Sequence, residues 1–186
     1  MKSIFSIYGT GGYAREVMPL LKAERTNSSL SKNREFYFID DSIDDSVKVN
    51  GFKVFRFDNL ISNFSEKKIH CCIAIADTLI RKKLTEKCIS NGIDIITVKA
   101  SNITIMDSVS IGEGAILSPF VTITSNVKIG KSFHGNLYSF IAHDCTIGDY
   151  VTFAPGVKCS GNVKINNNVY VGTGAIILPG KSGKPI

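Results

Sequence analysis

A six-residue period in the second half of the chain limits its possible folds more than any other feature. In steps of six from Ile105 to Ile177, twelve of thirteen positions are apolar, and Gly135 is the exception. The positions two residues earlier, from Ile103 to Ala175, are mostly small or β-branched. This hexapeptide repeat predicts a triangular β-solenoid in which each hexad forms one flat side and three hexads complete a coil. Glycine follows the main register at positions 112, 130, 148 and 172, where we expect sharp corners.

Charge separates this repeat from the first part of the chain. Residues 1–100 hold 16 of the 22 Lys and Arg and 12 of the 16 Asp and Glu. A solenoid interior claims two positions in every six, which leaves little room for charge. We therefore predict a small α/β domain over residues 1–100 and a solenoid domain over residues 101–186. The net charge of +6 is scattered, without a dense basic run, which argues against nucleic acid and suits small phosphorylated ligands.

The terminus and the cysteines indicate the compartment. The first residues lack the apolar core and cleavage site of a signal peptide, and no stretch approaches the ~20 apolar residues that span a bilayer. The five cysteines are an odd number and form no C-x-x-C pair. We expect a cytoplasmic protein with reduced, mostly buried thiols, no membrane span and no metal.

The first hundred residues alternate between strand and helix patterns. We predict strands at 3–8, 35–39, 54–55, 68–75 and 94–98, and helices at 13–22 and 78–90. The turn after the first strand reads G-x-G-x-x-A, a pattern that lets a phosphate approach the backbone at a helix N-terminus. Two acidic residues end the next strand, where this kind of fold holds a ribose or base. These residues predict a nucleotide site. A full dinucleotide fold needs about twice this length, so a mononucleotide or nucleotide-sugar fits better than NAD. The site comprises Gly9, Gly11, Gly12, Asp40 and Asp41.

Three histidines are candidates for chemistry. His143 projects outward at a corner of the predicted solenoid and is followed by Asp144, and one coil further along lies Gly161. An imidazole beside a carboxylate, with a backbone N–H nearby, can serve as a general base with an oxyanion donor. An ordinary exposed His–Asp corner remains the alternative. His134 occupies an outward position next to Gly135, and the third histidine, at 70, starts an apolar strand, which favours a structural role.

At these residues the sequence resembles a known family, the hexapeptide-repeat sugar acyltransferases. The family includes UDP-4-amino-sugar N-acetyltransferases of bacterial glycan synthesis and sialic acid O-acetyltransferases. The stretches that carry the resemblance are YGTGG at 8–12, FIDD at 38–41, IAIA at 73–76 with IRKK at 80–83, IAHDCTIG at 141–148 and GVKCSGNV at 156–163. The resemblance implies a Rossmann-like nucleotide-sugar domain followed by a left-handed parallel β-helix. It also implies a homotrimer with acetyl-CoA between neighbouring solenoids.

The resemblance further implies roles for individual residues. His143 would be the catalytic base, oriented by Asp144. Asn136 would lie near the acetyl donor, and the Gly161 N–H would meet the thioester carbonyl. The glycine turn would contact phosphate, and Asp40 or Asp41 would contact the base of a UDP- or dTDP-linked sugar.

Two departures from the family pattern leave the function open. Many relatives carry a second histidine where this chain has Thr152, and they continue for about one more coil beyond Ile186. The leading expectation is N-acetylation of a nucleotide-linked amino-deoxy sugar in bacterial surface-glycan biosynthesis, by direct transfer from acetyl-CoA. The alternatives are O-acetylation of a sugar such as sialic acid and a catalytically weak or inactive solenoid that binds a nucleotide.

Overall fold

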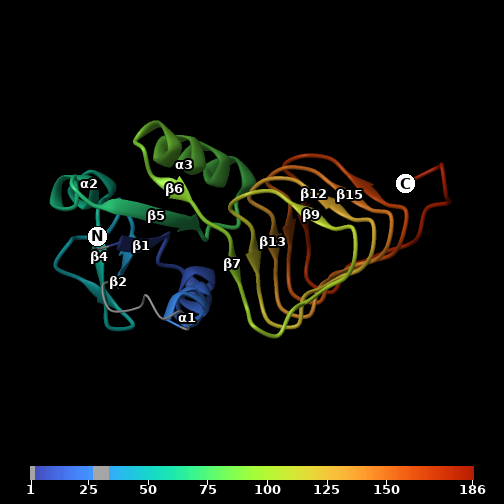
Figure 1. Cartoon of the computed structure of the whole chain (residues 1–186), viewed down its shortest axis with the longest axis horizontal. Coiled ribbons are helices and arrows are strands. Elements are labelled where there is room, and N and C mark those ends of the chain that lie inside the picture. Colours follow the sequence, from blue (N-terminus) through green and yellow to red (C-terminus); the bar gives the residue numbers. More distant parts are fainter. Residues whose placement is uncertain (1–2, 27–33) are drawn as a thin grey trace. The chain divides into compact units, whose positions relative to one another are not determined.

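A computed structural model of the chain describes residues 3–26 and 34–186, and its contacts divide it into two compact units. The first unit comprises Met1–Ile75 and Lys83–Ile96, and the second comprises Ala76–Lys82 and Thr97–Ile186. The first is an α/β unit, and the second is a stack of β-coils (Figure 1).

One sheet forms the centre of the first unit. Its strand order is β3-β4-β2-β1-β5-β6, and every pair is parallel except β3 with β4. The strands are β1 (Ser3–Tyr8), β2 (Arg34–Ile39), β3 (Lys48–Val49), β4 (Phe52–Phe55), β5 (Lys68–Ile73) and β6 (Asp94–Ile95). The helices are α1 (Gly12–Thr26), α2 (Phe57–Asn63) and α3 (Thr78–Ser90), and the first turn of α3 belongs to the second unit. The Rossmann-like arrangement is thereby confirmed: the first two parallel strands flank a glycine turn and a helix.

Most of the expected elements occur where the sequence placed them. The first strand and α3 have the predicted bounds, while α1 is longer than expected at both ends. The predicted apolar face of α1 is buried, because it packs on the sheet: Ala14, Val17, Met18 and Leu21. The expectation of a single strand over residues 94–98 is wrong. The segment forms β6 in the first unit and the start of β7 (Val98–Lys99), which already follows the coil register.

The second unit is a left-handed parallel β-helix with three flat sheets, whose stacked coils are visible in Figure 1. The sheets have the orders β19-β16-β13-β10-β7, β20-β17-β14-β11-β8 and β18-β15-β12-β9. Each strand pairs with the strand three hexads away, as Ile123 does with Ile105 and Ile141. The remaining two-residue strands are β8 (Thr104–Ile105), β9 (Ser110–Ile111), β10 (Ile116–Leu117), β11 (Thr122–Ile123), β12 (Lys128–Ile129), β13 (His134–Gly135), β14 (Phe140–Ile141), β15 (Thr146–Ile147), β16 (Thr152–Phe153), β17 (Lys158–Cys159), β18 (Lys164–Ile165), β19 (Tyr170–Val171) and β20 (Ile176–Ile177).

The two apolar registers fill the inside of the coils. From Leu117 to Ile165, the apolar side chains of both registers form one buried cluster, and residues such as Ile111 and Ile177 pack against its ends. Gly135 breaks the apolar register because the ring of Phe133 occupies the space. A Cβ at Gly135 would lie 3.0 Å from that ring and 3.4 Å from Leu117. Phe133 in turn meets Phe153 edge to face, with ring centroids 5.4 Å apart.

The corners show a regularity that the sequence did not reveal. Every sixth residue from Ser108 to Gly174 has a positive φ, and most of these residues are not glycine. Bonds between coils form at these corners, as when the Tyr150 N–H donates to the Lys131 carbonyl at 2.7 Å. These bonds hold the left-handed conformation at positions where it otherwise costs about 1–2 kcal/mol.

The glycines that follow the main register are required for a different reason from the one expected. Gly112, Gly130 and Gly148 do not have the positive φ of the corner residues. A Cβ at Gly130 would lie 2.7 Å from the Asp149 N, in the next coil, and the other two meet similar obstacles. Close approach of successive coils, rather than a left-handed backbone, therefore requires glycine at these three positions. At Gly172 there is nothing within 4 Å, so this explanation does not extend to it.

All five cysteines are buried free thiols, as expected: Cys71, Cys72, Cys88, Cys145 and Cys159. In the described ranges, none of the helices has the length and apolar character needed to cross a membrane.

Candidate active site

The predicted catalytic residues lie together at one corner of the β-helix. The His143 Nδ1 is 2.8 Å from the Asp144 Oδ2, and 60% of the His143 side chain is exposed. Both residues follow β14, and Asp144 takes one of the left-handed corner positions, with a φ of 60°. The backbone turn thus directs the two neighbouring side chains to the same side of the corner, where solvent and a ligand can reach the imidazole.

Gly161 lies one coil further along, directly against the His143 ring. A Cβ on Gly161 would be 2.6 Å from the ring Cε1 and 2.7 Å from Nε2. Because no side chain fits there, only glycine lets the imidazole rest against the backbone of the next coil. The link between the coils is also direct, since the Asn162 N–H donates to the His143 carbonyl at 3.0 Å.

Asp144 has a second partner that sequence reasoning did not single out. The Asn126 Nδ2 donates to the Asp144 Oδ1 at 3.2 Å. The hydrogen bond with His143, followed by the one from Asn126, holds the pKa of the Asp144 carboxyl below its ordinary value. Asp144 therefore stays charged at neutral pH and can accept a hydrogen bond from the Nδ1–H of His143. Asn126 precedes Asp144 by one full coil, so the spacing that led to Gly161 would also have found it.

Asn136 occupies a different corner of the coil. It follows β13, and its side-chain Oδ1 accepts from the Leu137 N–H at 2.7 Å, while its carbonyl accepts from the Ser139 hydroxyl. His143 follows the next strand, β14, at the next corner. The corner with the imidazole thus gathers three of the four residues predicted for acetyl transfer: His143, Asp144 and Gly161.

His134 has the expected outward position in its coil, but it is not exposed to solvent. Its side chain is fully buried, and its Nδ1 lies 3.3 Å from an Arg81 guanidinium nitrogen. Arg81 belongs to the segment Ala76–Lys82 of the same unit and also donates to the Tyr150 carbonyl at 2.7 Å. Thr152, beside His134 in the sheet, donates to the Ala76 carbonyl at 3.3 Å. This segment covers an outer face of the β-helix, which explains the burial.

The third histidine, His70, lies in β5 of the first unit. Its ring stacks on Phe5 with centroids 4.9 Å apart, and its Nδ1 is 3.4 Å from the Asp94 carboxylate. Burial lowers its pKa despite the nearby Asp94.

The glycine turn of the first unit leaves its backbone open. Gly9 has a φ of 105°, and its N–H donates to the Ile39 carbonyl at 2.8 Å, which joins the turn to β2. A Cβ on Gly11 or Gly12 would meet nothing within 4 Å. Open space beside the first backbone N–H groups of α1 is the arrangement that lets a phosphate approach.

The two acidic residues after β2 have different surroundings. Asp41 accepts from the Tyr8 hydroxyl at 2.5 Å, from the Phe57 N–H at 2.8 Å and from the Lys87 ammonium at 3.1 Å. Partial burial alone would raise the pKa of Asp41, but these hydrogen bonds outweigh it and keep the pKa below its ordinary value. Asp41 thus joins the ends of β1, α2 and α3 within its own unit.

Asp40 is held at the glycine turn instead. Its Oδ2 accepts from the Thr10 hydroxyl at 2.6 Å, and its Oδ1 accepts from the Ser42 N–H and hydroxyl. These bonds lower its pKa although burial opposes them. Asp40 therefore presents a charged carboxylate beside the turn. Thr10 and Tyr8, which orient the two acids, were not predicted, because their contacts depend on how the strands are paired.

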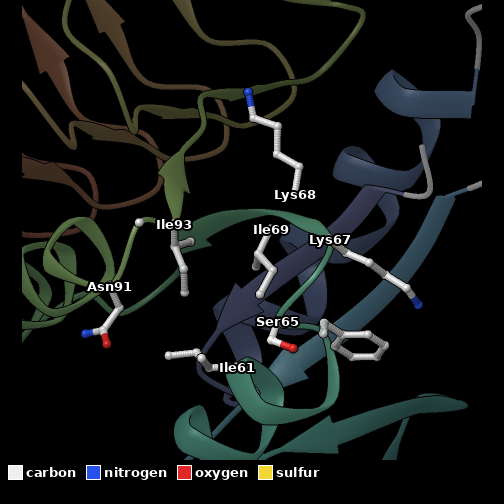
Figure 2. Close-up of a pocket in the computed structure, with 9 residues that line it drawn as sticks. Ile61, Ser65, Lys67, Lys68, Ile69, Asn91 and Ile93 are labelled. Carbon is white, nitrogen blue, oxygen red and sulfur yellow. The ribbon is translucent and has the colours of Figure 1, made fainter.

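A separate pocket of about 140 Å³ lies at the opposite edge of the same sheet (Figure 2). It is formed at the start of β5 and after the ends of α2 and α3, and Ile61, Ile69 and Ile93 line it. Figure 2 shows the side chains of Lys67 and Lys68 extending away from its centre. Ligands of parallel sheets bind at the carboxyl ends of the strands, where the glycine turn lies, so this pocket is not the predicted nucleotide site. Within the described ranges, no three His, Cys, Asp or Glu side chains gather as a metal ion requires.

Comparisons with known proteins agree with this arrangement of two units. The sequence profile of the PglD N-terminal domain matches residues 5–88. The chain is 42% identical to GDP-perosamine N-acetyltransferase of Escherichia coli O157:H7 over 184 residues, which cover 99% of this chain and 82% of the relative.

Solved structures extend the similarity to three dimensions. WeeI from Acinetobacter baumannii AYE superposes with a TM-score of 0.92 and 43% identity, covering 100% of this chain and 85% of that one. The acetyltransferase domain of PglB from Neisseria gonorrhoeae FA1090, solved in complex with acetyl coenzyme A, superposes with a TM-score of 0.78 and 25% identity, covering 95% of this chain and 82% of the other. With this identity and coverage, the chain belongs to the hexapeptide-repeat sugar acetyltransferase family and is an acyltransferase.

Proposed function

We propose that this chain transfers the acetyl group of acetyl-CoA to the amine of a nucleotide-linked amino-deoxy sugar, as a step in bacterial surface-glycan biosynthesis. The observation that carries the proposal is the His143–Asp144 pair, 2.8 Å apart and placed against Gly161 at an exposed corner. The E. coli relative is named for N-acetylation of a GDP-linked sugar, and the PglB domain was solved with acetyl coenzyme A, which supports the donor and the acceptor class.

The contacts suggest how the proton and the acetyl group move. When the Nδ1–H of His143 donates a hydrogen bond to Asp144, the unprotonated Nε2 is the base that removes a proton from the sugar amine. The amine nitrogen attacks the thioester carbonyl, and the Gly161 N–H donates to the oxygen that becomes negative. When the tetrahedral intermediate collapses, the C–S bond breaks and the leaving CoA thiolate takes the proton from the imidazolium. The products are the N-acetyl sugar and CoA.

The first unit would hold the nucleotide end of the acceptor. The open backbone of Gly11 and Gly12 suits the phosphates, and Gly9 allows the tight turn before them with its φ of 105°. Of the two acids, we assign Asp40 to the ligand, because Asp41 is occupied by Tyr8, Lys87 and the start of α2. The name of the E. coli relative makes a GDP-linked sugar the first acceptor to test, with UDP- and dTDP-linked sugars as the alternatives expected from the sequence.

A homotrimer would complete the site. Asn136 lies at a different corner from His143, so an acetyl donor between two neighbouring copies could contact Asn136 of one and His143 of the other. Light scattering on the purified protein should then give three times the chain mass of 20.2 kDa. A monomer that retains full activity would contradict this assembly.

The function is tested by incubating the protein with acetyl-CoA and GDP-, UDP- and dTDP-linked amino sugars, and by measuring product mass. We expect an N-acetylated product, and His143→Ala should lower kcat by about 10²–10⁴-fold. Thr146→Ala, an exposed change in β15, serves as the control. Acetylation of hydroxyl groups alone would identify a sugar O-acetyltransferase. Nucleotide binding without any product would identify a binding solenoid. Full activity of His143→Ala would exclude His143 as the base.

A further inference from the structure

One column of corner residues runs through the candidate active site. Asn126, Asp144 and Asn162 occupy the same corner in three successive coils, with φ angles of 61°, 60° and 56°. The Asn126 N–H donates to the Asp107 carbonyl at 3.1 Å, and the Asp144 N–H donates to the Ser125 carbonyl at 3.2 Å. These bonds between coils hold the backbone of each corner in the same conformation, so equivalent side chains of the column are one coil apart.

The Asp144 carboxylate divides its two oxygens between two neighbours. Oδ2 takes the hydrogen bond with His143, and Oδ1 accepts from the Asn126 amide at 3.2 Å. Asp144 is exposed, with 46% of its side chain in contact with solvent, so packing alone does not hold its carboxylate in one orientation. Asn126 supplies a hydrogen-bond donor to the carboxylate oxygen that does not bind the imidazole. Because the amide is neutral, it orients the carboxylate without cancelling the charge that faces His143.

We propose that Asn126 is a positioning residue for acetyl transfer, which acts by fixing the Asp144 carboxylate in the orientation that aligns the His143 ring. The inference rests on the proposed function of His143 as the base. It adds a residue that lies one coil before the His143–Asp144 pair and acts through Asp144 rather than on the reacting atoms. Its effect should therefore appear in kcat, because the alignment of the base matters in the transition state, and not in the KM for either substrate.

The test replaces Asn126 by glycine, which accepts the left-handed backbone and removes the amide. The matched control is Asn168→Gly. Asn168 is also an exposed corner residue, with a φ of 60°, and its N–H makes the equivalent bond to the Asp149 carbonyl at 2.9 Å. We expect Asn126→Gly to lower kcat roughly 10-fold with both KM values unchanged, because a misaligned base slows the chemical step without weakening binding. Asn168→Gly should change kcat less than about twofold.

A double-mutant cycle separates positioning from a general loss of structure. In an Asp144→Asn background, Asn126→Gly should cause no further loss of kcat, since the residue through which it acts has already been changed. Additive losses, or equal losses in Asn126→Gly and Asn168→Gly, would overturn the inference. Measuring His143→Ala in the same assay separates the positioning role of Asn126 from the proposed function. If His143→Ala is inactive while Asn126→Gly behaves like the control, only the positioning role is contradicted. If it is fully active, the proposed function fails as well.

Discussion

The two units assemble their candidate sites in opposite ways. In the β-helix, His143, Asp144, Gly161 and Asn126 come from one corner and are related by the repeat of one coil. In the α/β unit, the contacts of Asp41 come from the ends of different elements, including β1, α2 and α3. In a repeat, residues one coil apart in the sequence are neighbours in space. In an α/β unit, distant residues meet only when the whole sheet and its helices have formed.

The largest effect should come from the core of the β-helix. Phe133→Ala removes a fully buried ring that packs edge to face on Phe153, and the free energy of unfolding should fall by about 3–5 kcal/mol. Denaturant unfolding measures the loss. Tyr170→Ala, at an exposed position of β19, should change stability by no more than about 0.5 kcal/mol.

Phe133→Ala also tests whether the chain consists of two independently folding domains that divide near residue 100. Hydrogen exchange should show lost protection in the coils and unchanged protection of β1. Equal loss in both would mean that the two units unfold as one.

A smaller effect, confined to catalysis, should come from Gly161→Ala. The added methyl group would lie 2.6–3.0 Å from the atoms of the His143 ring, so the imidazole has to move away from its position on the next coil. We expect kcat to fall roughly 100-fold, the size seen when one transition-state donor is lost or misplaced. Gly172→Ala is the matched control, because a Cβ there meets nothing within 4 Å. Equal activity of the two variants would show that contact between the coils does not set the imidazole position.

The smallest expected effect concerns stability of the α/β unit at low pH. The folded state lowers the pKa of Asp41, so its charged form stabilises the fold above the unfolded value of about 3.9. That stabilisation is lost as the pH falls through the folded pKa. Asp41→Asn should therefore lower the Tm at pH 7, and the difference from the wild type should shrink below about pH 4. A difference in Tm that stays constant from pH 7 to pH 2.5 would show that the charge of Asp41 contributes nothing.

The repeat made most of the β-helix predictable. The period fixed which side chains point inward, and counting one coil forward from His143 led to Gly161, which the structure places against the ring. Counting one coil back from Asp144 leads to Asn126 in the same way. The glycines at 112, 130 and 148 were misread because spacing reveals a corner but not whether a glycine there serves φ or close approach.

Other features depended on tertiary contacts that no local pattern carries. His134 has an outward position in its coil, and its burial arises from Arg81, which lies 53 residues earlier in the sequence. Likewise, Asp40 and Asp41 are adjacent, and only the placement of Tyr8, Thr10 and Lys87 gives them different partners. The sequence pointed to an acidic pair but could not distinguish one acid from the other.

The bonds between successive coils make the active corner sensitive to chain length rather than to composition. From Asn126 to Gly174, the N–H of each corner residue donates to a carbonyl in the previous coil, as from Asn162 to His143. Deleting a single residue between Asp144 and Gly161 would bring a different residue against the imidazole and turn inward side chains outward. Inserting or removing one complete coil of three hexads before Asn126 would leave every spacing within the corner unchanged. Such a site can gain or lose whole coils on either side during evolution or design, but it cannot tolerate a change of one residue within.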